Sequence, residues 1–309
     1  RDFSYMVEYA GFAIPDQDIV NCIRYAVRHR RADGWMPDRV TTDGLAVYAA
    51  GIAAAPVGEA NLDNTPFLIF TVDSLSRRMD PEAFLPLFTE WEADLEQGLF
   101  LLPLEEHGLV YNDVQNPHSP YGFTDTIGKT GTLYMESLLY WRACRMMERM
   151  CKTYGIKNPD RFAKAAESVE RSLSLLFDPA AGAFYAATKD CHQYDIWGMA
   201  YMLYIGFPCS ADEKQAVLSF LEKNYDACVY RGQVRHLLKG QYWERLLIDV
   251  EPETYQNGAY WATASGWMIW CLAQQNPALA VRALEDVVSC FKTDGSFECI
   301  NEGYEKLPL

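Results

Sequence analysis

The sequence predicts an all-α fold, a toroid of helical hairpins that spans residues 1–309 as one domain. Helical stretches occur in pairs, and each pair has one helix that is apolar around most of its circumference and one amphipathic helix. The turns within pairs are short and the loops between pairs are long, which places all the long loops at one end of the inner helices.

The apolar periodicity predicts the individual helices. Their ranges are 3–12, 16–30, 64–79, 81–97, 127–153, 159–176, 195–206, 211–223, 258–275 and 277–291. The stretches 133–150 and 260–272 are apolar on most sides, which predicts inner helices. In 159–176 and 279–291 the apolar residues form a single stripe, which is typical of outer helices.

An acidic or amide residue precedes the inner helices at a regular interval. The residues are Asp2, Asp63, Asp125, Asp195, Asn257 and Glu298. The first four intervals are 61, 62, 70 and 62 residues, and a period near 60 with two helices per repeat indicates repeated hairpins. The last interval is 41 residues, so we expect the last hairpin to be incomplete or supplied differently.

Composition and charge exclude several classes of protein. Half of the residues are apolar and 14% are aromatic, which excludes a disordered chain. The net charge of -15 argues against nucleic acid and anionic lipid as partners, and no apolar run is long enough to cross a membrane. An acidic surface fits a neutral small molecule or polymer.

The nine cysteines are odd in number and form no CxxC pair, which favours a reducing compartment and predicts a cytoplasmic protein. No His or Cys spacing indicates a metal site. The sequence contains no GxGxxG, Walker or GxSxG motif, and we expect no cofactor.

The long loops and the first helical turns are rich in aromatic side chains. They include Trp35, Tyr111, Tyr121, Tyr194, Trp197, Tyr255, Tyr260 and Trp261. An Asp before a helix is usually an N-cap, and Trp197 and Trp261 also suit a core. Flat rings beside carboxylates and amides are equally the mixture that sugar recognition needs, and the tyrosines in polar loops favour this interpretation.

Several segments resemble the six-hairpin glycosidases, the (α/α)6-barrel group of neutral invertases, trehalases, glucoamylases and bacterial glucosidase-like proteins. The segments are Arg1-Asp2-Phe3-Ser4-Tyr5, Tyr121-Gly-Phe-Thr-Asp125-Thr-Ile-Gly-Lys129, Gln193-Tyr-Asp195-Ile-Trp197-Gly198, Tyr255-Gln256-Asn257-Gly258-Ala259-Tyr260-Trp261 and Asp294-Gly-Ser-Phe-Glu298-Cys-Ile-Asn301. Ala259 departs from the second glycine of the family loop, and Cys299-Ile300-Asn301 departs from its aromatic-Asp continuation.

The resemblance implies an inverting glycoside hydrolase with Asp125 as general acid and Glu298 as general base, their carboxyl groups roughly 6.5–9.5 Å apart. Tyr121 and Phe123 are expected to raise the pKa of Asp125, whereas a helix N-terminus and Lys129 are expected to lower it. The alternatives are an N-cap role for Asp125, and Glu302 or Glu305 in place of Glu298.

Further side chains are candidates for substrate binding. By resemblance, Arg1 and Asp2 bind sugar hydroxyls; Asp63 binds sugar or, slightly preferred, caps its helix. Trp35 is expected to be an exposed loop ring, and the Gln256 and Asn257 amides are suited to pairs of hydroxyls. The remaining candidates are Tyr121, Lys129, Asp195, Trp197, His236 and Trp261.

Exo action on a short α-gluco-type oligosaccharide or glycoside is favoured, because toroid pockets are usually deep. Two other hypotheses stay open. One is a sugar epimerase or lyase on the same toroid, in which His236 would face a second histidine. The other is a non-catalytic carbohydrate-binding protein.

Overall fold

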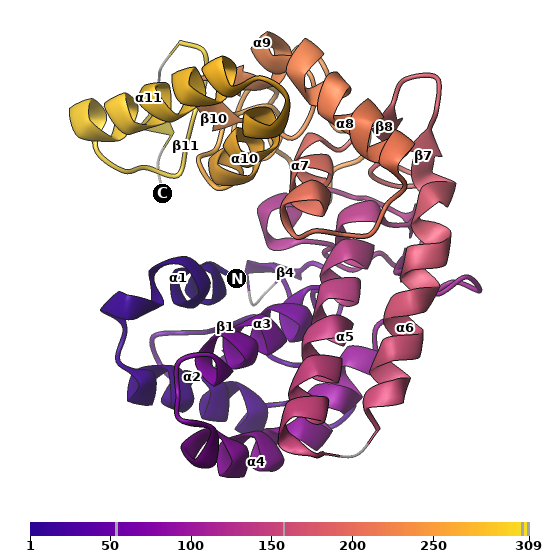
Figure 1. Cartoon of the computed structure of the whole chain (residues 1–309), viewed down its shortest axis with the longest axis vertical. Coiled ribbons are helices and arrows are strands. Elements are labelled where there is room, and N and C mark those ends of the chain that lie inside the picture. Colours follow the sequence, from indigo (N-terminus) through magenta and orange to yellow (C-terminus); the bar gives the residue numbers. More distant parts are fainter. Residues whose placement is uncertain (53–54, 157, 304–305, 308–309) are drawn as a thin grey trace. The chain divides into compact units, whose positions relative to one another are not determined.

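The computed structural model describes residues 1–52, 55–156, 158–303 and 306–307 (Figure 1). The chain divides into two compact units. The first comprises Arg1–Asp125 and Leu139–Ser172, and the second comprises Thr126–Leu138 and Leu173–Leu309. Helical hairpins dominate both units, which confirms the predicted all-α class. The prediction of one domain over 1–309 stays a prediction.

The first unit is built on helices paired through short turns. They are α1 (Asp2–Ala10), α2 (Asp16–Arg28), α3 (Asn64–Ser76), α4 (Pro81–Phe100), α5 (Tyr134–Tyr154) from Leu139 onward, and α6 (Pro159–Ser172). Helix α3 packs against α1, α2 and α4 and is buried on almost all sides, as predicted for an inner helix. Phe67 and Phe70 from α3 and Phe84 and Phe88 from α4 contribute to the core.

The long loops of the first unit fold into short two-stranded hairpins. Strands β1 (Arg39–Val40) and β2 (Ala46–Val47) pair antiparallel, as do β3 (Gly51–Ile52) and β4 (Ala55–Pro56). Further elements are β5 (Tyr111–Asn112) and the 3-10 turns η1 (Gly11–Ala13) and η2 (Gly122–Thr124).

The second unit repeats the hairpin plan. Its helices are α7 (Ile196–Tyr204), α8 (Ala211–Lys223), α9 (Tyr225–Cys228), α10 (Ser265–Gln275) and α11 (Pro277–Asp294), with the 3-10 turn η3 (Leu173–Leu176). Its strands are β6 (Gly131–Thr132), β7 (Phe177–Asp178), β8 (Ala183–Phe184), β9 (Val229–Tyr230), β10 (Gln233–Val234), β11 (Cys299–Ile300) and β12 (Lys306–Leu307). Helix α10 packs against α7, α8 and α11.

Helix starts follow from local capping chemistry. Asp80 accepts a hydrogen bond from Glu82 N at the start of α4, with Pro81 in the first helical position. Ser210 and Glu213 form a capping box on α8, which begins and ends where the sequence predicts. Asn276 caps α11 in the same way as Asp80 caps α4.

Two inner helices begin later than predicted. Helix α5 starts at Tyr134 rather than 127, and α10 starts at Ser265 rather than 258. The residues before them are extended and form bridges such as Ile127↔Leu246 and Tyr260↔Ile300. Asp125 and Asn257 therefore do not stand at first helical turns, which corrects the predicted arrangement and removes the N-cap alternative for Asp125.

The apolar stripe of α11 is only partly covered. Ala283 and Val287 are buried, but Leu284, Val288 and Phe291 are 38–49% exposed.

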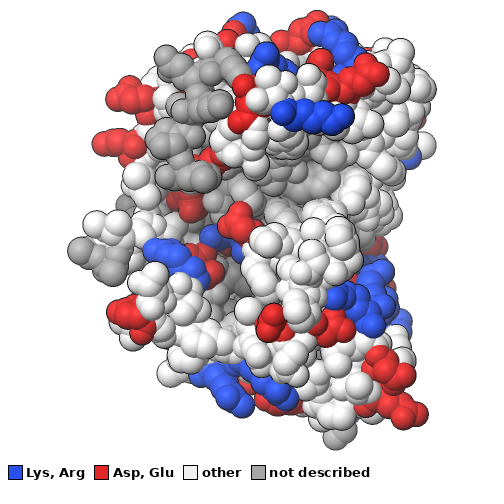
Figure 2. Space-filling view, turned by 90° about the vertical axis from the view of Figure 1, so that its left-hand side faces the viewer, with Lys and Arg blue, Asp and Glu red and all other residues white. Residues whose placement is uncertain are grey.

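Figure 2 shows Lys and Arg side chains scattered among Asp and Glu side chains on the face drawn. All nine cysteines lie in described residues and are free thiols. Among the described helices, none is long and apolar enough to cross a membrane.

Candidate functional site

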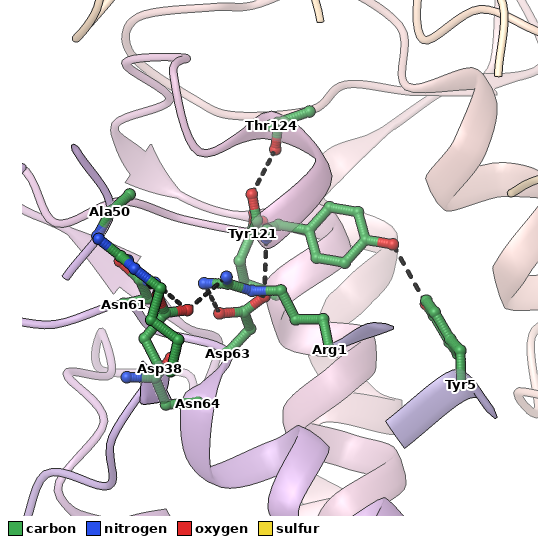
Figure 3. Close-up of polar contacts among 12 residues, drawn as sticks. Arg1, Tyr5, Asp38, Ala50, Asn61, Asp63, Asn64, Tyr121 and Thr124 are labelled. Atoms are coloured by element: carbon green, nitrogen blue, oxygen red, sulfur yellow. Dashed lines mark hydrogen bonds and ion pairs between the residues drawn. The ribbon is translucent and has the colours of Figure 1, made fainter. Parts of the chain in front are cut away.

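Arg1 is held by two buried carboxylates in the first unit (Figure 3). Its Nε and Nη2 donate to Asp63 Oδ2 and Oδ1 at 2.7 and 3.0 Å, and its Nη1 pairs with Asp38. Burial opposes the positive charge, but Asp63 and Asp38, with a smaller contribution from Asp125, outweigh it and raise the pKa of Arg1. The guanidinium is therefore a fixed cation near Asp125.

Asp63 does not cap α3, although it occupies the N-cap position. Its Oδ2 accepts from Gly122 N at 2.7 Å as well as from Arg1. The preferred sequence interpretation, a helix cap, is wrong, because a buried cation and a loop amide use the carboxylate instead. Asp63 thus joins the N-terminal helix to the loop that carries Asp125.

Sequence reasoning paired Asn64 with Asp63 but missed the roles of Asn61 and Asp38. Asn61 Nδ2 donates to Asp38 Oδ1 at 2.9 Å, and Asn61 Oδ1 accepts from Ala50 N at 2.8 Å. Asn64 Nδ2 donates to Met36 O and Tyr48 O. The available signal was the pair of asparagines that flank Asp63 in the segment Asn61-Leu-Asp-Asn64.

Aromatic rings precede Asp125 as expected. Tyr121 is 1% exposed, its hydroxyl lies 3.1 Å from that of Tyr5, and its ring lies 5.5 Å from that of Phe123. Asp125 follows η2 and is half-buried. Asp125 does not stand at the N-terminus of α5, because that helix begins only at Tyr134.

Two other candidates in the first unit differ in exposure. Asp2 is exposed at the start of α1. Trp35 is only 6% exposed and its ring lies 5.3 Å from that of His118, so the expectation of an exposed loop ring is wrong. Gly34, with a φ of 115°, turns the chain so that the indole packs inward.

Lys129 forms a buried ion pair in the second unit. Its Nζ donates to Glu136 Oε1 at 2.6 Å, and the exposed fractions of the two side chains are 1% and 2%. Burial raises the pKa of Glu136 against the opposing effect of Lys129. Sequence reasoning missed Glu136; an acidic residue in the first turn of a helix predicted to be an inner one was the signal.

Asp195 is a helix cap in the same unit. Its Oδ1 accepts from Gly198 N at 2.8 Å at the start of α7, which confirms the capping interpretation for this residue. Burial raises the pKa of Asp195, and Lys129 partly offsets the rise. The carboxyl group of Asp195 thus caps α7 and also has a pKa that responds to Lys129.

Buried rings surround His236. The imidazole stacks on Trp197 at 3.9 Å and lies 6.3 Å from the ring of Trp243. Trp197 Nε1 donates to Val234 O and Trp261 Nε1 donates to Tyr255 O. These three candidates, His236, Trp197 and Trp261, are each no more than 3% exposed.

The two candidate amides bind within the protein. Gln256 Oε1 accepts from Thr126 N at 2.9 Å and from Thr126 Oγ1 at 2.7 Å. Asn257 Oδ1 accepts from Trp243 N, and its Nδ2 donates to Val250 O, each at 3.0 Å. The Gln256 amide oxygen and the Asn257 amide are thus engaged in holding loops.

Glu298 is half-buried and directly precedes β11. The strand is fixed by two hydrogen bonds between Tyr260 and Ile300. The competitor Glu302 bonds to Lys239 Nζ at 2.6 Å and to Tyr260 OH at 2.8 Å; the Lys239 bond and then that of Tyr260 lower the pKa of Glu302. The other competitor, Glu305, lies outside the described residues.

Among the described residues, no group of three or more His, Cys, Asp or Glu side chains has an arrangement that would hold a metal ion.

No protein-family model and no curated protein sequence matches the chain. Solved structures do match. The GH63 mannosylglycerate hydrolase from Thermus thermophilus, in complex with Tris, aligns with 99% of this chain and 89% of its own, at a TM-score of 0.68 and 14% identity. Glucoamylase from Saccharomycopsis fibuligera aligns over 94% and 76%, with a TM-score of 0.60 and 11% identity.

A GH78 rhamnosidase of Bacillus sp. GL1 aligns with 93% of this chain and 26% of its own, with a TM-score of 0.59 and 12% identity. At these identities the likeness concerns the fold. It confirms the all-α fold of helical hairpins expected from the sequence.

Proposed function

We propose that this protein is a glycoside hydrolase. The observation that carries the proposal is a structural similarity over nearly the whole chain. The matching structures are those of more than one kind of glycoside hydrolase, including a mannosylglycerate hydrolase and a glucoamylase. A fold alone does not define a reaction. The proposal therefore also draws on the motifs around Asp125 and Glu298.

Asp125 is proposed as the general acid and Glu298 as the general base of an inverting reaction. The acid protonates the leaving oxygen while the base removes a proton from the attacking water. Both residues are half-buried, so neither is closed off from solvent. Glu302 is a weaker candidate for the base, because Lys239 and Tyr260 already bind its carboxylate.

The substrate is proposed to be a short α-gluco-type oligosaccharide or glycoside, cleaved from one end. Candidate binding residues are Arg1, Asp2, Trp35, Asp63, Tyr121, Lys129, Asp195, Trp197, His236, Asn257 and Trp261. Arg1 and Asp63 are fixed by their mutual ion pair, so they would act as a preorganised polar wall.

The test is a screen of α- and β-linked disaccharides with the wild type, Asp125→Asn and Glu298→Gln. Both variants are expected to lose about 10³-fold in kcat. Asp113→Asn is the matched control, since Asp113 is an acid in the same stretch of chain as Asp125, and Glu302→Gln tests the competing base. Asp113 is exposed and accepts hydrogen bonds from Gln115 N and Asn116 N, so its variant should keep activity.

Activity that survives both site variants would refute the assignment. Loss in Glu302→Gln with activity retained in Glu298→Gln would transfer the base to Glu302. Sugar binding measured by calorimetry without turnover would favour a carbohydrate-binding protein, and interconversion of sugars without hydrolysis would favour an epimerase.

A further inference from the structure

A single buried oxygen fixes the residue that follows Asp125. Gln256 Oε1 accepts hydrogen bonds from both the backbone N and the Oγ1 of Thr126, at 2.9 and 2.7 Å. Gln256 is 1% exposed and Thr126 is 6% exposed. In this low-dielectric setting, losing the acceptor would leave two buried donors unsatisfied, so the contact is hard to break.

The other backbone group of Thr126 is bound as well. Its carbonyl accepts from Leu247 N at 2.7 Å and from Ile248 N at 3.3 Å. The next residue, Ile127, forms a bridge with Leu246, and Gly128 N donates to Arg245 O. Segment 126–128 is thereby fixed on the loop that precedes Gln256.

The loop that carries Gln256 is itself rigidly built. Glu253 and Tyr255 have positive φ values of 61° and 41°, which non-glycine residues adopt only when their surroundings hold them there. Gln256 O accepts from Trp243 Nε1 at 3.0 Å, and Glu253 N donates to Asn257 O. Strained backbone held in this way often marks a functional loop.

The covalent geometry transmits this constraint to Asp125. The carbonyl of Asp125 and the amide N–H of Thr126 belong to one planar peptide unit. Fixing the N–H of Thr126 therefore fixes the plane that contains the Cα of Asp125. The carboxyl group then retains only the ψ of its own residue and its side-chain torsions.

We propose that Gln256 is a positioning residue for Asp125, which deepens the proposed function and rests on it. It acts on the acid through Thr126 rather than through the substrate. A direct contact from its amide oxygen to sugar is disfavoured because that oxygen already accepts two hydrogen bonds. The role predicts a defect in turnover rather than in substrate affinity.

The experiment compares Gln256→Met, which keeps the length and removes the acceptor, with Gln256→Glu, which keeps an oxygen acceptor. Gln233→Met is the matched control: Gln233 is a fully buried glutamine whose amide bonds to Cys290 Sγ. Thr126→Val is a second variant that removes only the hydroxyl donor and serves if Gln256→Met does not fold. Amide exchange at Thr126, kcat and KM are measured for each.

In Gln256→Met, exchange at the Thr126 amide is expected to rise about tenfold. Its kcat should fall by up to about 10²-fold with KM nearly unchanged, because a small misplacement of a catalytic group costs this much. Thr126→Val should show a smaller loss of the same kind. Gln256→Glu should restore the protection, and Gln233→Met should behave like the wild type.

A rise in KM at constant kcat would show that Gln256 binds substrate and would overturn the proposal. Unchanged exchange at Thr126, or a loss of thermal stability with kcat intact, would overturn it too. If the wild type cleaves no glycoside, the proposed function fails separately. Amide exchange at Thr126 and NMR titration of the Asp125 carboxyl group then test whether Gln256 positions Asp125. Unchanged values of both in Gln256→Met would refute the positioning role.

Discussion

Asp63 stands immediately before α3, yet its carboxylate binds the guanidinium of Arg1 instead of its own helix. The two bonds of this pair measure 2.7 and 3.0 Å, and Asp63 has no exposed side-chain surface. A third bond, from Gly122 N, extends the contact to the loop before Asp125. One side chain therefore connects three segments that are far apart in the sequence.

Asp63→Asn is expected to lower the free energy of unfolding by about 3 kcal/mol, because it leaves a buried cation with only part of its counter-charge. The measurement is urea unfolding at neutral pH. Asp80→Ala is the comparison, since Asp80 is a true cap on α4 and its loss should cost about 1 kcal/mol. An equal or smaller loss in Asp63→Asn would contradict the ion-pair interpretation.

Asp195 gives a prediction about pH. Its folded pKa is raised above the ordinary 3.8 by burial, so the folded state holds the proton more tightly than the unfolded state. Between these two pKa values, stability falls as pH rises. Asparagine caps a helix as well as aspartate but carries no charge. Asp195→Asn should therefore gain stability relative to the wild type as pH rises from below 3.8 through the folded pKa.

The comparison requires unfolding curves of both proteins across that range. Below pH 3.8 most Asp195 carboxyls are neutral in both states, so the difference there reports the cap alone. A relative stability that is constant with pH, or that moves in favour of aspartate, would show that Lys129 offsets the burial more than assumed.

The Lys129–Glu136 pair should be costly to break and cheap to replace. Lys129→Met alone leaves the Glu136 carboxylate buried without its cation and is expected to cost about 3–5 kcal/mol. The double variant Lys129→Met with Glu136→Leu should recover most of that loss, since apolar side chains suit this interior. A double-mutant cycle by chemical denaturation measures the coupling, and additive losses would argue against a direct pair.

The helical periodicity of the apolar residues predicted most of the helices. Within the stripe of α6, Phe162, Ala166 and Val169 are fully buried, as their spacing of three and four residues predicts. The start of α8 was predictable because Ser210 and Glu213 have the spacing of a capping box. Both features depend only on neighbouring residues.

The starts of α5 and α10 were not predictable by the same reasoning. Their apolar leading segments resemble helix in composition, but they bind strands distant in sequence, as Tyr260 binds Ile300. Gly131 and Gly258 have φ values of 81° and 123°, which a right-handed helix does not allow. Only knowledge of the tertiary partners distinguishes these segments from helix.

The candidate site shows the same limit. Asp63 and Asp195 look alike in the sequence, as acids before apolar helices. Asp195 caps its helix, whereas Asp63 binds Arg1, a partner 62 residues away. Composition can select the residue type, but the choice between cap and ion pair depends on contacts that local pattern does not encode.

The two proposed catalytic carboxylates should respond differently to the leaving group. A nitrophenyl glycoside departs without protonation, so Asp125→Asn should lose far less activity on it than on a disaccharide. Glu298→Gln should be impaired by about 10³-fold on both substrates, because each needs an activated water. Steady-state kinetics on the two substrates provide the test, and equal losses for both variants on both substrates would contradict the separate roles.

The configuration of the first product tests the inverting mechanism. A base that delivers water to the face opposite the leaving group converts an α-glycoside into a β-sugar in one step. Proton NMR recorded in the first minutes, before the anomers equilibrate, should show the β-anomer first. A retaining α-glucosidase acting on the same substrate serves as the control and should release the α-anomer. Initial release of the α-anomer by this protein would require a covalent intermediate, and Glu298 would then have to act as a nucleophile instead of a base.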